Sequence, residues 1–127
     1  LHGFLSYIIK CAINKKPYTV FGYKGKQVRD QIHCADVISA FEYFIDSPRK
    51  GEVYNIGGCK ENTSSILEII DTLDDVYGIP LDHKIMKDNR PGDHICYYTN
   101  MTKFKTHYPL WKKQWSLNDI ISEMINR

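Results

Sequence analysis

Apolar residues recur at helical spacing in four stretches of the chain, and two of these stretches lie in its N-terminal half. The first predicted helix covers residues 1–15, and Pro17 closes it. The second follows Asp36, whose carboxylate suits an N-cap, and it stops at Pro48. Its apolar face is predicted to consist of Val37, Ala40, Phe41, Phe44 and Ile45.

The other two helices are predicted in the C-terminal half. Ser65 and Glu68 have the spacing of a capping box, and Gly78 with Pro80 ends the helix that they begin. A last helix begins near Ser116. The apolar face of the third helix comprises Ile66, Ile69, Ile70, Leu73 and Val76, and that of the last comprises Leu117, Ile120, Ile121 and Met124.

Short runs of β-branched and aromatic residues between these helices predict strands. The runs are "TVF" (19–21), "QIHC" (31–34), "EVYNIG" (52–57), "HKIMK" (83–87) and "ICYYT" (95–99). The helix between "QIHC" and "EVYNIG" gives the spacing of a βαβ crossover, which joins parallel strands. We therefore expect an α/β fold in which helices cover short strands.

Composition narrows the possible functions. The 127 residues suffice for one domain with a buried core, and a net charge of +2 gives no support for a nucleic-acid partner. No apolar stretch approaches the ~20 residues of a membrane span. The four cysteines are scattered and form no C-x-x-C pair, so we expect neutral thiols in a reducing cytoplasm and no metal site.

The segment "FGYKGKQVRD", residues 21–30, is rich in glycine and basic residues. A dinucleotide-binding fingerprint requires G-x-G-x-x-G ahead of a helix, but Gly22 and Gly25 are three apart and precede a predicted strand. We therefore predict no cofactor-binding residues in it. The planar guanidinium of Arg29 can donate two hydrogen bonds to a phosphate, which favours a phosphate-binding role. The alternative interpretation of the segment is a solvated turn.

A second turn, "NRPGDH" at residues 89–94, carries an arginine and a carboxylate. Pro91 and Gly92 fix the turn, so Arg90 and Asp93 can project from one rigid site. An arginine neutralises phosphate oxygens, and a carboxylate accepts hydrogen bonds from ribose hydroxyls. With Arg29, these groups suit a nucleoside diphosphate. An Arg90–Asp93 surface ion pair is the alternative.

The same segments resemble a known family. "PYTVFGYKGKQVRDQIHCADVISAF", "PRKGEVYNIGG", "NRPGDHI" and "HYPLW" are similar to the C-terminal part of extended short-chain dehydrogenase/reductases, the NAD-dependent epimerase/dehydratase family. The combination of "GYKGKQVRD", "NRPGDHI" and "HYPLW" resembles its CDP-sugar 2-epimerase branch. The resemblance implies a Rossmann-type enzyme with NAD on an N-terminal domain. Residues 1–127 are then a single C-terminal nucleotide-sugar-binding fragment without that domain.

The resemblance also assigns substrate-binding residues. Arg29 and Arg90 match the arginines that bind the diphosphate, and Asp93 matches the acid that binds the ribose. By the same resemblance, residues 18–22 form the edge of the site that contacts the pyrimidine base, partly through backbone groups. The remaining members of the expected substrate-binding set are Tyr18, Val20, Gly22 and Gln27.

No catalytic residue is predicted in this chain. The family's catalytic Tyr-x-x-x-Lys lies on a Rossmann helix, and although Tyr108 and Lys112 have that spacing, Pro109 is incompatible with a helix interior. The chain opens at Leu1 inside a predicted helix, so we expect a piece of a longer protein that by itself has neither epimerase activity nor NAD affinity. Structural roles are expected for Asp30, His33, Asp36, Trp111 and Trp115.

The resemblance implies a cytoplasmic NAD-dependent isomerase that inverts C2 of a CDP-sugar through a transient keto sugar. Its expected partner is a nucleotide sugar, and we expect it to bind neither nucleic acid nor a membrane. The longer protein can form a homo-oligomer. Two alternatives remain. The chain can belong to another nucleotide-sugar 4-epimerase or dehydratase, or it can be a non-enzymatic binding or interaction module.

Overall fold

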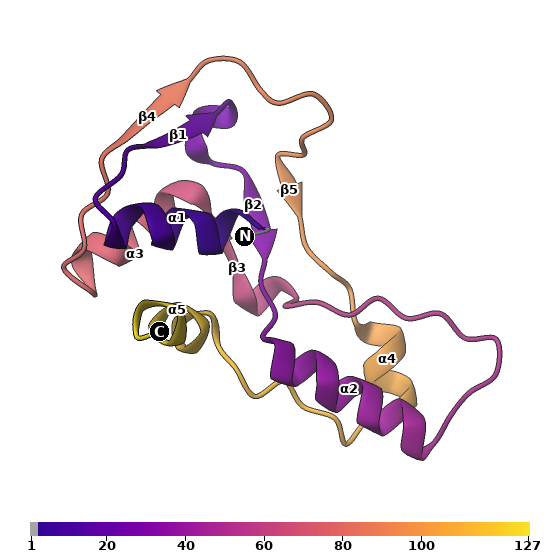
Figure 1. The fold of residues 1–127 in the computed structure, drawn as a ribbon. Helices are drawn as coiled ribbons and strands as arrows, with labels where there is room; N and C mark the ends of the chain where they lie inside the picture. The colour runs from indigo at the N-terminus through magenta and orange to yellow at the C-terminus, as the bar shows by residue number, and fades with distance from the viewer. Residues whose placement is uncertain (1–2) are drawn as a thin grey trace. The chain divides into compact units, whose positions relative to one another are not determined.

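A computed structural model describes residues 3–127, and the chain divides into two compact units (Figure 1). The first unit comprises the described residues up to Arg29, Ser64–Tyr97 and Ile121–Arg127. The second comprises Asp30–Thr63 and Tyr98–Ile120. Leu1 and His2, which fall in the first predicted helix, lie outside the described residues.

The first unit is built on a parallel strand pair. Strand β1 (Tyr18–Phe21) pairs with β4 (His83–Met86), so the predictions at "TVF" and "HKIMK" are confirmed. Helix α1 (Phe4–Ile13) contacts helix α3 (Ile66–Asp75), as expected from their apolar faces (Figure 1). The fully buried side chains of this unit are those of Leu5, Ile8, Val20, Ile69, Leu73 and Ile121.

A second parallel pair lies close to the two loops singled out in the sequence. Strand β2 (Val28–Asp30) pairs with β5 (Cys96–Tyr97), with Arg29 opposite Tyr97, and β3 (Thr63–Ser65) completes the sheet in the order β3-β2-β5. The prediction of a strand within "ICYYT" is therefore confirmed. The pairing fixes Arg29 beside the chain that leaves the "NRPGDH" turn.

Helix α3 begins with the predicted capping box. The Glu68 backbone N–H donates to Ser65 Oγ at 3.2 Å, and the Ser65 backbone N–H donates to Glu68 Oε2 at 2.7 Å. These reciprocal bonds satisfy donors that a helix N-terminus otherwise leaves open. Four of the five residues predicted for its apolar face are buried, but Val76 at the C-cap is 69% exposed.

The Glu68 carboxylate makes this cap dependent on pH. The backbone N–H of Ser65, with its hydroxyl, holds the pKa of Glu68 below its ordinary value of 4.5. Such a group stabilises the fold above the unfolded-state pKa, and the contribution is lost as pH falls through the folded-state pKa. We expect Glu68→Gln, which keeps an acceptor but not the charge, to lower the free energy of unfolding by about 0.3–1 kcal/mol at pH 7 and by less at pH 3, measured by urea unfolding. Equal losses at both pH values would contradict this.

The second unit contains helix α2 (Cys34–Asp46), helix α4 (Thr102–His107) and long irregular segments. Trp111, only 3% exposed, packs edge-on to Phe104 with ring centroids 5.4 Å apart, so its predicted role in the core is confirmed. Trp115 instead stacks on His33, with ring centroids 3.9 Å apart. The apolar cluster of this unit consists of Ala40, Cys59, Met101, Phe104, Tyr108 and Trp111.

Two predicted strands are wrong. "QIHC" is not a strand, because β2 ends at Asp30 and His33 already caps α2 by accepting the Ala35 backbone N–H on its Nδ1. "EVYNIG" is irregular, and its Val53 is 79% exposed. The expected βαβ crossover is therefore absent from the described residues. A buried-strand pattern forms a strand only when a neighbouring strand pairs with it, and none does so in residues 3–127.

The expected N-cap and apolar face of α2 also need correction. Asp36 lies in the first turn of α2 rather than at its N-cap. Of the predicted face, Ala40 is buried, but Phe41 and Ile45 are 57% and 71% exposed. The spacing of apolar residues predicted the helix correctly. It did not show which of these residues pack against the rest of the second unit.

Two carboxylates of the second unit hold its irregular segments. Asp36 is 1% exposed and accepts the backbone N–H groups of Gln114 at 2.8 Å and Trp115 at 3.1 Å. Asp30 Oδ2 accepts those of Cys59 and Thr99, both at 3.0 Å. The structural roles predicted for these two acids are confirmed.

None of the helices in the described part of the chain is long and apolar enough to cross a membrane.

Candidate functional site

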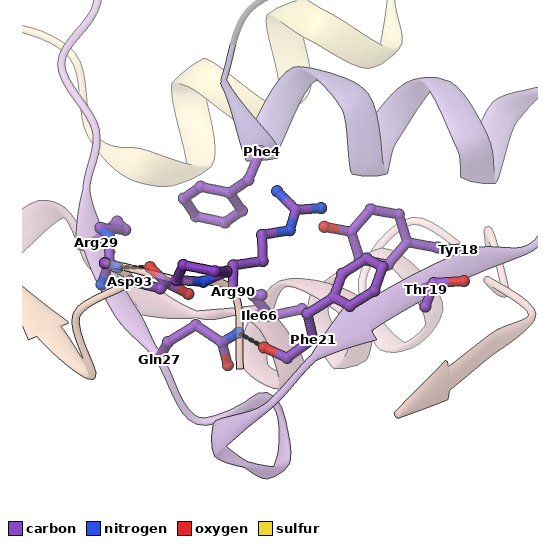
Figure 2. Close-up of a pocket in the computed structure, with 11 residues that line it drawn as sticks. Phe4, Tyr18, Thr19, Phe21, Gln27, Arg29, Ile66, Arg90 and Asp93 are labelled. Atoms are coloured by element: carbon purple, nitrogen blue, oxygen red, sulfur yellow. Dashed lines mark hydrogen bonds and ion pairs between the residues drawn. The ribbon is translucent and has the colours of Figure 1, made fainter. Parts of the chain in front are cut away.

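The first unit has a cavity of about 310 Å³, open to solvent, between the two loops that the sequence singled out (Figure 2). Strand β1 contributes Tyr18, Thr19 and Phe21 to its wall, and helices α1 and α3 contribute Phe4 and Ile66. The "NRPGDH" turn supplies the opposite boundary through residues 90–93. The polar side chains of the cavity are those of Gln27, Arg29, Arg90 and Asp93.

Arg29 and Asp93 form an ion pair in the cavity wall. Arg29 Nη2 lies 2.5 Å from Asp93 Oδ1, and the two side chains are 22% and 23% exposed. The same nitrogen donates to the His94 carbonyl at 2.6 Å, and Arg29 Nη1 donates to the Val28 carbonyl at 2.7 Å. Asp93 Oδ1 also accepts the His94 backbone N–H at 3.0 Å. This network fixes the Arg29 guanidinium and links β2 to the turn.

The second arginine of the cavity is held differently. The Arg90 guanidinium carbon lies 4.7 Å from the centroid of the Phe21 ring, a cation–π geometry. Within residues 3–127 Arg90 forms no ion pair, so the Arg90–Asp93 pair considered from the sequence does not form. Figure 2 shows its side chain extending across the cavity with the guanidinium directed toward Tyr18. Arg90 is therefore an exposed cation at the cavity for which residues 3–127 supply no neutralising carboxylate.

Tyr18 closes the end of the cavity that Arg90 approaches. Its side chain is only 6% exposed, and burial raises the pKa of its phenol, while the positive charge of Arg90 acts in the opposite direction. The phenol therefore keeps its proton at neutral pH. The Tyr18 ring also contacts Tyr7, with centroids 5.8 Å apart, which fixes its orientation.

Gln27 is buried in the cavity wall with an exposed fraction of 6%. Its Nε2 donates to the Phe21 carbonyl at 3.1 Å (Figure 2). Its Oε1 is buried and has no hydrogen-bond partner in the described part of the chain. A buried acceptor without a partner is uncommon.

The glycine-rich segment and the "NRPGDH" turn are joined by hydrogen bonds. The Tyr23 backbone N–H donates to Asn89 Oδ1 at 3.1 Å, and the Tyr23 hydroxyl donates to the Asp93 carbonyl at 2.9 Å. Gly22 has φ +69°, and its N–H donates to the Met86 carbonyl at 3.0 Å. Asn89 thus occupies the space that a side chain at position 22 would need.

Gly22→Ala is expected to disturb both loops. A Cβ at this position would lie 1.7 Å from Asn89 Oδ1 and 2.7 Å from Asn89 Cα, and alanine would also be strained at positive φ. We expect a loss of about 1–2 kcal/mol in the free energy of unfolding, measured by urea titration. Gly51 also has positive φ, but a Cβ added there would meet nothing within 4 Å, so Gly51→Ala is the control for strain alone. Equal losses in the two variants would show that the Asn89 contact is unimportant.

The structure brings together five residues of the expected substrate-binding set: Tyr18, Gln27, Arg29, Arg90 and Asp93. Val20, with an exposed fraction of 0%, is not among the lining residues, and neither is Gly22. Lys24 and Lys26 are exposed outside the cavity, so the solvated-turn interpretation describes these two lysines. Sequence reasoning did not single out Phe4 and Ile66 for the site, because their helical spacing indicated only a core position.

Comparison with known proteins identifies the family. The NAD dependent epimerase/dehydratase family matches residues 1–57. A UDP-glucuronic acid 4-epimerase from Bacillus cereus, solved with UDP-glucuronic acid and NAD, superposes with a TM-score of 0.79 at 30% identity over 94% of the chain. The chain belongs to the NAD-dependent epimerase/dehydratase family. The predicted α/β fold and the family resemblance are therefore confirmed, and the solved relatives are Rossmann-type enzymes.

Curated relatives act on different nucleotide sugars. CDP-paratose 2-epimerase of Salmonella typhi is 41% identical over 75 residues, or 58% of the chain. UDP-glucose 4-epimerase of Bifidobacterium longum is 30% identical over 128 residues, or 94% of the chain. The chain spans 22% and 36% of these two relatives and 37% of the solved B. cereus enzyme.

The described residues do not fit the NAD that the solved B. cereus enzyme contains. Gly22 and Gly25 lead into a 3₁₀ turn (Tyr23–Gly25) and then β2, so no helix N-terminus faces them as a pyrophosphate site requires. Tyr108 and Lys112 also lack the expected helical setting, because α4 ends at His107. The Tyr108 hydroxyl instead donates to the Ser47 carbonyl at 2.9 Å.

Proposed function

We propose that the chain is the nucleotide-sugar-binding part of an NAD-dependent sugar epimerase, and that its cavity holds the nucleoside diphosphate. The observation that carries the proposal is the Arg90 guanidinium, which faces the cavity without a carboxylate partner among the described residues. A diphosphate supplies the negative charge that this cation lacks. The volume of about 310 Å³ lies at the lower end of the range for small-ligand sites.

The other polar groups suit the remaining parts of such a ligand. Arg29 is already neutralised by Asp93, so it contributes hydrogen-bond donors and rigidity more than net charge. The Asp93 carboxylate has acceptor capacity left for ribose hydroxyls, because its contacts with Arg29 and the His94 N–H both use Oδ1. The Phe21 ring lines the same cavity, and the Arg90 guanidinium lies over it.

NAD in this proposal is bound by a separate N-terminal domain, since the described residues form no site for it. When bound, that cofactor supplies reversible oxidation of a sugar carbon. The residues of this chain bind and orient the nucleotide sugar. We therefore infer that the chain by itself has neither epimerase activity nor measurable affinity for NAD.

The finer proposal is a CDP-sugar 2-epimerase that inverts C2 through a transient keto sugar. It is supported by the 41% identity to CDP-paratose 2-epimerase, which exceeds the 30% identity to UDP-glucose 4-epimerase, although over fewer residues. The second candidate is a 4-epimerase or dehydratase that acts on a UDP- or dTDP-sugar. It is favoured by the longer match to the UDP-glucose enzyme.

Calorimetric titration of the chain tests the proposal with CDP, UDP, dTDP and NAD as ligands. We expect at least one pyrimidine nucleoside diphosphate to bind, and NMR shift changes to centre on residues 18–29 and 90–93. No binding of any diphosphate would refute the proposed cavity function. NAD binding would refute the division of roles between this chain and a separate domain.

A further inference from the structure

The ring of Phe21 holds the Arg90 guanidinium at the cavity. The guanidinium carbon lies 4.7 Å from the ring centroid, and within residues 3–127 no ion pair holds this arginine. Both side chains line the cavity (Figure 2). Arg90 is exposed and its side chain is long, so without the ring its guanidinium would sample many rotamers. The contact with Phe21 therefore limits where this cation lies.

The backbone that carries the Phe21 ring is fixed on both sides. Phe21 is the last residue of β1, and it pairs in register with Met86 of β4. Its carbonyl accepts a hydrogen bond from Nε2 of the buried Gln27 at 3.1 Å. The next backbone N–H, that of Gly22, donates to the Met86 carbonyl at 3.0 Å. The ring therefore stands on a rigid strand end, whereas Arg90 projects from the turn that follows β4.

An aromatic ring can hold a cation without neutralising it. The ring face attracts a guanidinium through its quadrupole and carries no net charge. A carboxylate holds the cation and neutralises it as well, as Asp93 does for Arg29, with Nη2 2.5 Å from Oδ1. The cavity therefore holds its two arginines in different ways. The contact with Phe21 leaves the positive charge of Arg90 available to the oxygens of a phosphate.

We propose that Phe21 is a positioning residue, whose ring holds the Arg90 guanidinium where it binds the diphosphate of the nucleotide sugar. This inference rests on the proposed function. A side chain that is already held loses less conformational freedom when the ligand binds, so the contact strengthens binding. The ring face that Arg90 covers is not available to the base of the nucleotide.

A double-mutant cycle with CDP as the ligand tests this role, with affinities measured by calorimetric or NMR titration. Phe21→Leu keeps an apolar side chain but removes the ring face, and we expect CDP to bind about 3- to 10-fold more weakly. In the Arg90→Ala background we expect the same substitution to change the affinity less than about twofold, because no cation is left to hold. Phe21→Tyr keeps the ring, and we expect its affinity to stay within about twofold of the unaltered chain.

The difference between the two backgrounds is the readout, since general damage to the cavity appears in both. UDP carries the same diphosphate, so we expect the cycle to give the same difference with UDP as with CDP. Equal losses from Phe21→Leu in both backgrounds, or no loss in either, would overturn the positioning role. Tighter binding by Phe21→Leu would also overturn it, by showing that the ring keeps Arg90 away from the ligand.

Each of these three results would leave the diphosphate site itself intact. If neither CDP nor UDP binds the unaltered chain, the proposed function fails, and the role of Phe21 fails with it.

Discussion

Replacing Arg90 with alanine is expected to weaken binding of CDP about 10- to 100-fold. A hydrogen bond between charged groups contributes about 1.5–3 kcal/mol, which corresponds to that change in the dissociation constant. Arg90 is the cavity cation without a carboxylate partner in the described chain, so its charge is not neutralised by the protein and is available to a diphosphate. Calorimetric titration of the variant measures the loss directly.

Two further variants make this result specific. Arg90→Lys keeps the charge but not the planar fork, so we expect an intermediate affinity. Arg49→Ala removes an exposed arginine of the second unit and is expected to leave CDP binding unchanged. Equal affinities of the Arg90→Ala variant and the unaltered chain would remove Arg90 from the site.

Asp36→Ala is expected to lower the free energy of unfolding by about 3–5 kcal/mol. The carboxylate is 1% exposed and accepts the backbone N–H groups of Gln114 and Trp115. Removing it leaves two donors without their partner and creates a small void, and each bond to a charged acceptor contributes about 1.5–3 kcal/mol. Urea unfolding monitored by tryptophan fluorescence measures this change, because Trp115 adjoins the contact.

Asp46→Ala is the matched control, since Asp46 ends the same helix and is exposed. We expect a loss below about 0.5 kcal/mol for this variant. Asp36→Asn keeps one acceptor oxygen, so its loss should fall between those of the two alanine variants. If Asp36→Ala were no less stable than Asp46→Ala, the segment at residues 114–115 would not depend on this carboxylate.

Helices α1, α2, α3 and α5 (Leu117–Ile125) were predictable because their signals are local, whereas the six-residue α4 was not predicted. The capping box of Ser65 and Glu68 requires only four consecutive residues, and the apolar face of α3 follows from spacing. The strands at "TVF" and "HKIMK" were also located correctly. "EVYNIG" was not, because β-branched and apolar residues form a strand only beside another strand.

The site was predictable in part. Arg29, Arg90 and Asp93 were selected from two turns, and the structure places all three around one cavity. Their pairing was not predictable, because the sequence suggested Arg90 with Asp93 over a short separation. Arg29 takes this partner instead, since parallel pairing of β2 with β5 fixes its backbone beside residues that follow Asp93.

The sequence by itself determined helices α1, α2, α3 and α5, the turn chemistry and the family, because these depend on residues that are neighbours along the chain. Only the tertiary structure decided which arginine is neutralised and which faces the cavity as a free cation among the described residues. It also decided that Gln27 is buried with an oxygen that no group of residues 3–127 pairs with. The physical reason is that charge compensation and burial depend on contacts between residues more than 60 positions apart, as for Arg29 and Asp93.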